Sequence, residues 1–249
     1  MHKIKKAFLF DIDGTLLSTG GAGRKAMNRA FFKVHGITNA LEGLSLSGKT
    51  DPQIYTEITR KFGSVPNLDN FKEIYFSFLK EELPNFNGHG SLMPGVQTIL
   101  GHLSEQHDCI LGILTGNWQR GAELKLNYFG LFNYFSFGAF GEDGESRLEL
   151  PAAAKKRAHE KYSERIDNHI EYFIIGDTPR DIQCAKYSHC KSVAVATGEY
   201  TSSDLKAHEP ELLFADLLDI EAFCSSVGIA PPNTRKYPNC DSFLKLINN

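Results

Sequence analysis

An apolar run that ends in two closely spaced aspartates constrains this chain more than any other feature. Phe8–Phe10 is followed at once by Asp11, Ile12, Asp13 and Gly14. Continuous apolar runs are typical of strands buried on both faces, so the acids are expected in the loop at the strand's C-terminal end. Ligands bind at this edge of an open parallel sheet. Two carboxylates so close repel each other unless a cation or a shared proton is present. The pattern therefore indicates a metal-assisted site with one carboxylate free to react.

Two other interpretations of this stretch are open. A strand that ends in an Asx-type turn would also place Asp and Gly here, because both are common turn residues. A calcium loop would need further acids and a closing Glu at fixed spacing. Leu16, Leu17 and Ser18 follow instead, which argues against a calcium loop.

Strand and helix patterns alternate along most of the chain. After the first strand, apolar runs predict strands at 109–114, 172–175, 192–196 and 212–214, with a short strand within 134–140. Helical spacing of apolar residues fills the segments between them. This alternation predicts the α/β class, with a doubly wound parallel sheet as a Rossmann-like core.

Residues 18–90 interrupt the alternation. Three segments there have helical spacing and none reads as a strand, so we expect an inserted α-helical cap domain. The catalytic core would then comprise residues 1–17 and 91–228. Residues 229–249 would be a C-terminal tail whose structure the sequence does not predict.

The composition limits which binding partners and which cellular compartment we expect for this protein. The net charge of −3 does not favour nucleic acid or an anionic membrane surface as a partner, and no apolar stretch is long enough to span a bilayer. The five scattered cysteines form no Cys-x-x-Cys motif, so we expect reduced thiols and a cytoplasmic protein. The nine histidines lack zinc-ligand spacing. A monomer or a homodimer is expected.

Polar residues follow three of the predicted strands. Asp11 and Asp13 follow the first, Thr115 follows the second, and Asp177 and Asp181 follow the third. The carboxyl ends of parallel strands gather at one edge of the sheet, so these side chains are expected to meet. Three such endings together are hard to explain as turns alone.

At these residues the chain resembles the haloacid dehalogenase-like hydrolases. The stretch 11–15, the strand-ending Thr115 and the stretch 176–181 match the first, second and fourth motifs of that superfamily, in order. A helical insert directly after the first motif resembles its small cap domain. The resemblance extends over residues 5 to about 227.

The resemblance implies a nucleophile, an acid–base group and a metal site. Asp11 would attack phosphorus and form an aspartyl-phosphate. Asp13 would protonate the leaving oxygen and then deprotonate the hydrolytic water. Mg²⁺, which prefers oxygen ligands, would be bound by Asp11, the backbone carbonyl of Asp13 and Asp177. Asp181 would be a further ligand or would orient the others.

The resemblance also implies a phosphate-binding loop. Thr115 and the backbone amides of Gly116 and Asn117, at the start of a helix, would hold phosphoryl oxygens. The third motif departs from the family, because its usual Lys-Pro does not occur. We favour Arg147 in that role, since its fork can bind phosphate. Lys155 and Lys156 are the alternative, although a solvated helix face is the usual place for such a pair.

Asp13 favours phosphoryl transfer within the family, since attack on carbon needs no acid there. Residues 115–117 and 48–51 look most like the phosphoglycolate phosphatase-like branch. Arg24 and Lys49 would lie in the cap and could meet the organic part of an anionic substrate, or could equally be surface cations.

The resulting prediction is a magnesium-dependent phosphatase that acts on a small phosphorylated metabolite. A phosphomutase resembling β-phosphoglucomutase is the nearest alternative, because it would use the same nucleophile. A non-catalytic protein that senses phosphate is a less favoured one.

Overall fold

A six-stranded parallel sheet organises the molecule. The structure is a computed structural model, and it describes residues 3–85 and 90–232. The strand order is β5-β4-β1-β6-β7-β8, with every neighbouring pair parallel. The six strands are β1 (Ile4–Phe10), β4 (Cys109–Leu114), β5 (Phe137–Ala139), β6 (Ile166–Gly176), β7 (Lys191–Val195) and β8 (Leu212–Phe214). The predicted α/β class and parallel sheet are confirmed.

Strand β1 lies in the middle of the sheet and is buried on both faces. Phe8 pairs with Leu111 of β4 on one side and with Phe173 of β6 on the other. Phe8 and Phe10 belong to the apolar cluster on one face, and Leu9 belongs to the cluster on the opposite face. This explains why the run at the start of the sequence is apolar without alternation.

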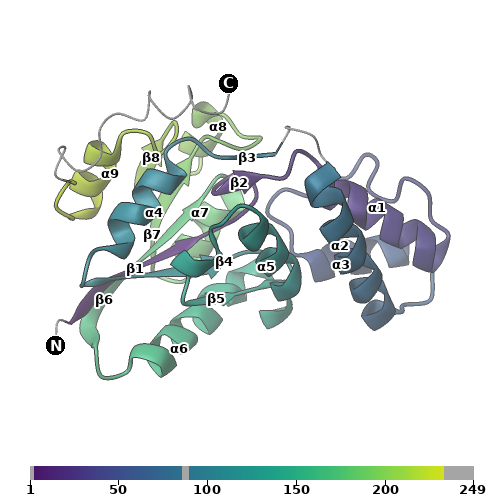
Figure 1. Cartoon of the computed structure of the whole chain (residues 1–249), viewed down its shortest axis with the longest axis horizontal. Coiled ribbons are helices and arrows are strands. Elements are labelled where there is room, and N and C mark those ends of the chain that lie inside the picture. The colour runs from purple at the N-terminus through teal and green to yellow at the C-terminus, as the bar shows by residue number, and fades with distance from the viewer. Residues whose placement is uncertain (1–2, 86–89, 233–249) are drawn as a thin grey trace.

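Helices cover both faces of the sheet (Figure 1). Helices α4 and α9 contribute to the cluster that contains Phe8, and α6 and α7 contribute to the cluster that contains Leu9. The helices outside the insert are α4 (Val96–Ser104), α5 (Gln119–Tyr128), α6 (Leu150–Tyr162), α7 (Pro179–Tyr187), α8 (Ser202–Lys206) and α9 (Ile220–Val227). Strands β4 and β5 lie on one side of β1, and the chain then crosses to the other side to form β6. The loops after β1, β4 and β6 therefore meet at a topological switch point.

The helical insert, defined here as residues 19–85, lies to the right of the sheet in Figure 1. It consists of α1 (Ala22–His35), α2 (Asp51–Lys61) and α3 (Leu68–Asn85). The three helices have an apolar cluster of their own, in which the rings of Phe31, Tyr55 and Phe71 contact one another.

A two-stranded ribbon joins the insert to the core. Strands β2 (Leu17–Ser18) and β3 (Ser91–Leu92) are antiparallel, and Ser18 pairs with Ser91. The chain therefore leaves the core and returns to it side by side. This ribbon was not predicted, because two-residue strands have no periodicity to detect.

Trp118 joins the insert to the core a second time. It directly precedes α5, yet its side chain is buried in the insert's cluster, with ring centroids 5.6 Å from Tyr75 and 6.1 Å from Phe71. Aromatic contacts of this kind add to the free energy gained from burial. The insert thus packs on the core through an apolar contact as well as through the chain connections.

Several boundaries differ from those predicted. Strand β6 starts at Ile166 rather than near 172, and the loop before α6 contains two short 3₁₀ helices, Gly141–Asp143 and Arg147–Glu149. At the start of the predicted tail, Ile229 packs on the core and the carbonyl of Ala230 accepts a hydrogen bond from His102. Most of that tail, residues 233–249, lies outside the described residues.

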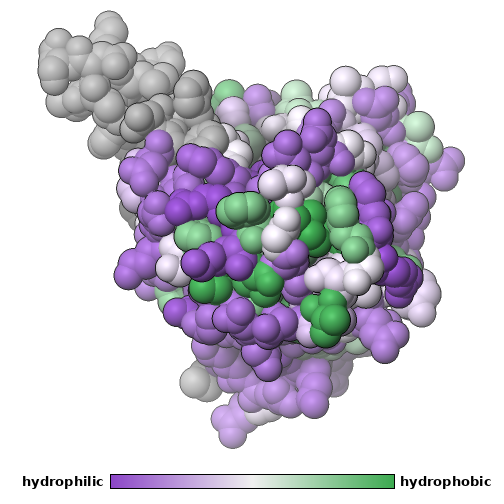
Figure 2. All heavy atoms as spheres, turned by 90° about the vertical axis from the view of Figure 1, so that its right-hand side faces the viewer, coloured by the Kyte–Doolittle hydropathy of each residue, from purple (hydrophilic) through white to green (hydrophobic). Residues whose placement is uncertain are grey.

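The surface is mostly polar. Seen from the side of the insert, apolar side chains lie near the middle of the face with hydrophilic residues around them (Figure 2). The exposed large apolar residues of the insert are Phe32, Phe62, Val65 and Leu68. Among the described residues, no helix has the length and apolar character needed to cross a bilayer.

Candidate active site

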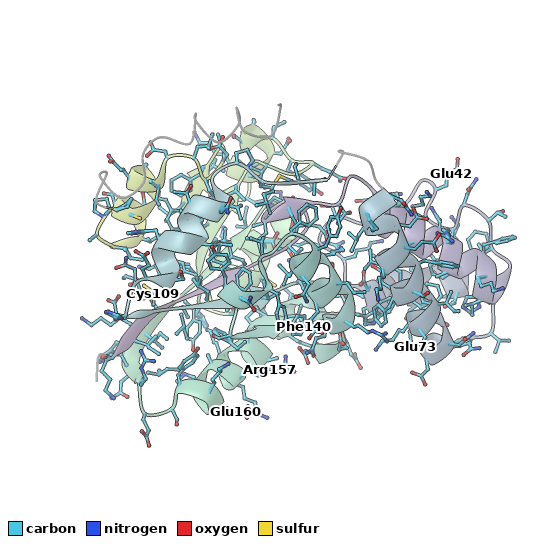
Figure 3. All side chains as sticks on the ribbon, viewed as in Figure 1. Glu42, Glu73, Cys109, Phe140, Arg157 and Glu160 are labelled. Carbon is cyan, nitrogen blue, oxygen red and sulfur yellow. The ribbon has the colours of Figure 1, made fainter. Side chains whose placement is uncertain are left out.

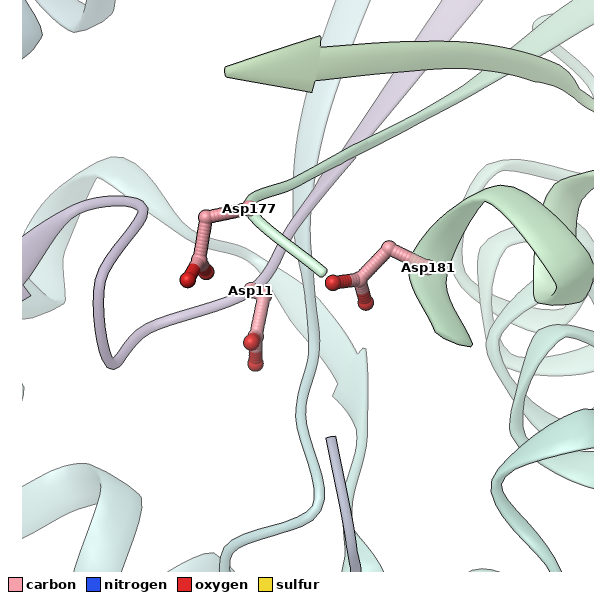
Figure 4. Close-up of side chains that lie close together, drawn as sticks. All are labelled: Asp11, Asp177 and Asp181. Carbon is pink, nitrogen blue, oxygen red and sulfur yellow. The ribbon is translucent and has the colours of Figure 1, made fainter. Parts of the chain in front are cut away.

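Three buried aspartates lie together at the carboxyl edge of the sheet (Figure 4). Asp11 follows β1, Asp177 follows β6, and Asp181 lies in the first turn of α7. Each offers a carboxylate oxygen within 4.8 Å of the other two. The structure therefore brings these three side chains together, as the sequence led us to expect.

The start of α7 fixes the position of Asp181. Thr178 caps the helix: its hydroxyl accepts the N–H of Asp181, and Asp181 Oδ2 accepts the backbone N–H (3.1 Å) and hydroxyl (2.6 Å) of Thr178. Pro179 occupies the first turn, where its missing N–H costs nothing. This capping box explains the residue pattern of the stretch 176–181 in local terms.

Arg147 bridges two of the acids. Its Nη2 lies 2.6 Å from Asp181 Oδ1 and 3.2 Å from Asp11 Oδ1, and the side chain is buried. Its Nε has no hydrogen-bond partner in the described part of the chain. Because Thr178 donates to the other oxygen of Asp181, each oxygen of that carboxylate accepts a hydrogen bond.

The two alternative lysines lie elsewhere. Lys155 Nζ donates to the carbonyl of Ser188 at 2.7 Å and lies over the ring of Tyr172, and Lys156 is exposed beside Glu160. Of the three candidate cations, Arg147 is the one whose position suits the third motif. Its role there stays a prediction.

The loop before Arg147 is held from α6. Arg157 donates to Asp143 Oδ1 at 2.7 Å and to the carbonyl of Gly138 at 2.7 Å. Asp143 in turn accepts the N–H of Phe140 at 2.8 Å. Arg157 and Phe140 can be followed in Figure 3. These hydrogen bonds fix the start of the polar loop that precedes Arg147. The conformation of this loop could not be predicted from the sequence alone.

Glycines leave room for Asp177. A Cβ on Gly198 would lie 1.7 Å from Asp177 Oδ2, and one on Gly14 would lie 2.4 Å from the same atom. Gly14 also has a φ of +86°, a conformation that favours glycine. The other oxygen of Asp177 accepts a hydrogen bond from Thr15 Oγ1 at 2.8 Å. Only glycines at these two positions let the carboxylate lie where it does.

The acidic cluster carries more negative charge than its one arginine can balance. Burial raises the pKa of Asp177 to about 8, and repulsion from Asp11 and Asp181 adds to this. Burial also raises the pKa of Asp11 to about 6 against the opposing effect of Arg147. Excess buried negative charge surrounded by oxygen ligands suits a hard divalent cation. Asp11 and Asp177 therefore fit a Mg²⁺ site on the chemistry of their donor atoms.

A second polar group lies beside the acids and centres on Asp13. Its Oδ2 accepts hydrogen bonds from Lys125 Nζ at 2.6 Å and from Asn117 Nδ2 at 3.0 Å. Lys125 also donates to Asn117 Oδ1 at 2.6 Å, so the three side chains form a closed ring. Lys125 was not among the residues predicted for the site. Its place between Ala122 and Leu126, on the inward face of α5, is the signal that could have revealed it.

The loop 115–117 lies between the acids and the insert. Thr115 is buried, and its Oγ1 accepts the N–H of Asn117 at 3.4 Å. The carbonyl of Gly116 accepts the N–H of Asp51 at 2.7 Å, and a Cβ on Gly116 would lie 2.3 Å from the carbonyl oxygen of Lys49. Gly116 thus permits close contact between the loop and the insert.

Asp51, the last residue of the stretch 48–51, is a buried acid. Thr50 caps α2, and Asp51 Oδ2 instead accepts the backbone N–H of Trp118 at 2.9 Å. Burial raises the pKa of Asp51 to about 7, against the opposing effect of Lys125.

A pocket of about 420 Å³ opens over both polar groups. Arg24 and Lys49 line it, as do the predicted core residues Asp11, Asp13 and Asp177. Arg24 donates to the carbonyl of Leu41 at 3.0 Å, and Lys49 pairs with Glu57. The apolar residues with which the insert lines this pocket are Met27, Leu41, Leu46, Ile54 and Tyr75.

The fold and the site define an α/β protein with an acidic centre at the switch point, under a helical insert. The chain belongs to the haloacid dehalogenase-like hydrolase family, whose model matches residues 8–195. The resemblance seen in the sequence is confirmed.

Named relatives place the chain near phosphatases. It is 25% identical over 202 residues to a phosphoglycolate phosphatase from Rhodobacter capsulatus, covering 81% of this chain and 88% of that protein. It is 21% identical over 224 residues to the pyrophosphatase PpaX from Oceanobacillus iheyensis, covering 86% and 94%. The expected class of enzyme, a phosphatase, agrees with both names.

Solved structures share the fold at lower identity. A predicted phosphoglycolate phosphatase from Haemophilus somnus has a TM-score of 0.58 at 21% identity, covering 90% of this chain and 99% of that one. A proposed β-phosphoglucomutase from Bacteroides vulgatus has a TM-score of 0.63 at 18% identity, covering 91% and 90%.

Proposed function

We propose that this protein is a magnesium-dependent phosphatase that hydrolyses a small phosphorylated metabolite through an aspartyl-phosphate on Asp11. The observation that carries the proposal is the position of Asp11. Its carboxylate lies at the sheet's switch point, 3.2 Å from the guanidinium of Arg147 and next to Asp177. A nucleophilic carboxylate beside a fixed cation and a metal-binding acid is suited to attack an anionic phosphate.

The reaction proceeds in two displacements. In the first, an oxygen of Asp11 attacks phosphorus, the bond from phosphorus to the leaving oxygen breaks, and Asp13 gives that oxygen a proton. In the second, Asp13 takes a proton from water, the water oxygen attacks phosphorus, and the bond to Asp11 breaks. Inorganic phosphate leaves, and both aspartates return to their starting states.

Asp11 and Asp177 would hold the metal together with the backbone carbonyl of Asp13. When bound, Mg²⁺ neutralises charge on the phosphoryl group and so lets an anionic nucleophile approach it. Asp181 would orient Arg147 through the hydrogen bond from Nη2, and its carboxylate also lies close enough to be a further ligand.

Thr115 and the amides of Gly116 and Asn117 would hold phosphoryl oxygens, with the unpaired Nε of Arg147 as a further donor. The insert would act as the cap that keeps bulk water from the site. It also supplies Arg24 and an apolar wall to the pocket. These features support a substrate with a small organic part under the insert, as the phosphatase relatives suggest.

A panel of phosphorylated metabolites, phosphoglycolate included, tests the proposal through phosphate release with and without Mg²⁺. We expect release from at least one ester, dependent on Mg²⁺ and abolished in Asp11→Asn. Conversion of one sugar phosphate into another without release would favour a phosphomutase. Absence of turnover together with tight binding of phosphate would favour a sensor.

A further inference from the structure

The side chains of Asn117 and Lys125 form a ring with Asp13 and have no role in the mechanism above. We propose that Lys125 is a positioning residue: with Asn117 it fixes one oxygen of Asp13, so that the other is presented to the leaving group and then to water. The proposal rests on the proposed phosphatase function and concerns the same site.

The hydrogen bonds are unevenly divided between the two oxygens of Asp13. Oδ2 accepts from both Lys125 and Asn117, at 2.6 and 3.0 Å. Among the described residues no side chain donates to Oδ1, and 42% of the Asp13 side chain is exposed, in the wall of the pocket. One oxygen is therefore held and the other is accessible to a bound ester.

Lys125 is buried, unlike a lysine on a solvated helix face. Its side chain is 5% exposed, and burying an ammonium is costly unless it is paired and hydrogen-bonded. The bonds to Asp13 Oδ2 and Asn117 Oδ1 meet that requirement. The bond between Lys125 and Asn117 also fixes the orientation of the Asn117 amide that donates to Asp13. Loss of the ammonium would thus loosen both donors of Asp13.

The insert closes over this ring. A Cβ on Gly23, in the first turn of α1, would lie 3.7 Å from both Cε and Nζ of Lys125. Lys125 therefore lies between the acid–base group and the start of the insert.

Lys125→Met tests the proposal with p-nitrophenyl phosphate and Mg²⁺ as the probe. We expect kcat to fall by about tenfold or more, since acid–base catalysis contributes about 10²–10⁴-fold. KM should fall together with kcat, so that kcat/KM changes by less than about threefold. The p-nitrophenolate group leaves without help from an acid, but hydrolysis of the aspartyl-phosphate still needs the base. A rapid burst of p-nitrophenolate, close to one per enzyme, should therefore precede the slow steady state.

A second variant and a double-mutant cycle separate positioning from general stability. If Lys125 acts through Asp13, adding Lys125→Met to Asp13→Ala should lower kcat no further. Lys6→Met is the matched control, because Lys6 is also a largely buried lysine paired with an acid, Glu171, but lies near the N-terminal end of β1, away from Asp13. It should leave kcat unchanged. Should Lys125→Met fail to fold, Lys125→Gln keeps a donor, and its kcat should lie between those of wild type and Asp13→Ala.

The outcomes distinguish the two proposals. Wild-type turnover with an unchanged kcat in Lys125→Met would overturn the role of Lys125 and leave the phosphatase intact. Equal losses in the wild-type and Asp13→Ala backgrounds would do the same. A wild-type protein that releases phosphate from no ester would remove the proposed function and this inference with it.

Discussion

The backbone N–H of Trp118 donates to Asp51 Oδ2 at 2.9 Å, and this bond joins the core to the insert beside the candidate active site. The N–H of Asp51 donates in return to the carbonyl of Gly116 at 2.7 Å. One residue of the insert is thus bonded both to the loop 115–117, proposed to hold phosphate, and to the residue that follows it.

Replacing Asp51 tests the importance of this junction. Asp51→Ala leaves the buried N–H of Trp118 without an acceptor, so it should lower the free energy of unfolding by about 1–3 kcal/mol. Asp51→Asn keeps an acceptor oxygen and should cost less. Urea unfolding measures both, with Asp69→Ala, an exposed first-turn acid of α3, as the control. Equal stabilities of Asp51→Ala and the control would show that the bond contributes nothing.

The stability of the metal-free protein should fall as the pH rises toward 8. Asp177 has a folded-state pKa of about 8 against an ordinary value of 3.8, so between these values the folded state binds more protons than the unfolded state. Each pH unit then costs up to about 1.4 kcal/mol for this group. Urea unfolding at pH 6 and pH 8 should show the fall, and Mg²⁺ should reduce it. In Asp177→Asn the fall should be smaller, and an unchanged fall would refute the assignment to Asp177.

Gly198→Ala should weaken Mg²⁺ binding. The new Cβ would lie 1.7 Å from Asp177 Oδ2, so the carboxylate must move away from its place next to Asp11. We expect the Mg²⁺ concentration for half-maximal activity to rise about tenfold or more, on the scale at which supporting residues affect metal affinity. Gly101→Ala is the control, because a Cβ there meets open space on a helix. A Gly198→Ala protein with wild-type Mg²⁺ dependence would show that Asp177 does not bind the metal.

Arg147→Ala should lower kcat/KM by about 10²-fold or more, because a fixed cation at the transferring phosphoryl group is removed. Lys155→Ala loses only contacts to Ser188 and Tyr172, so its kcat/KM should stay close to that of the wild type. Steady-state kinetics on the best substrate compares the two. The reverse order of effects would assign the third motif to α6.

Much of the fold and the acidic centre could be predicted because their signals are local. The apolar run of β1 and the capping pattern before Asp181 are properties of adjacent residues. The positions of Lys125 and Asp51 could not be predicted in the same way. Each depends on packing between segments far apart in the sequence, since Lys125 meets Asp13 across 112 residues and Asp51 meets Trp118 across 67. A buried charge at an inward helical position is a sign of such a site, but its partner is found only in three dimensions.

The ribbon formed by β2 and β3 bears on how such a chain can diversify. Because Ser18 lies opposite Ser91, the segment between them is covalently connected to the core at a single place. Segments inserted at such a place can be lengthened, exchanged or lost with little change in the strands that carry Asp11 and Asp177. Substrate choice and the chemistry of the acids can therefore evolve separately, except at the few residues, Trp118 and Lys125 among them, where the two parts meet.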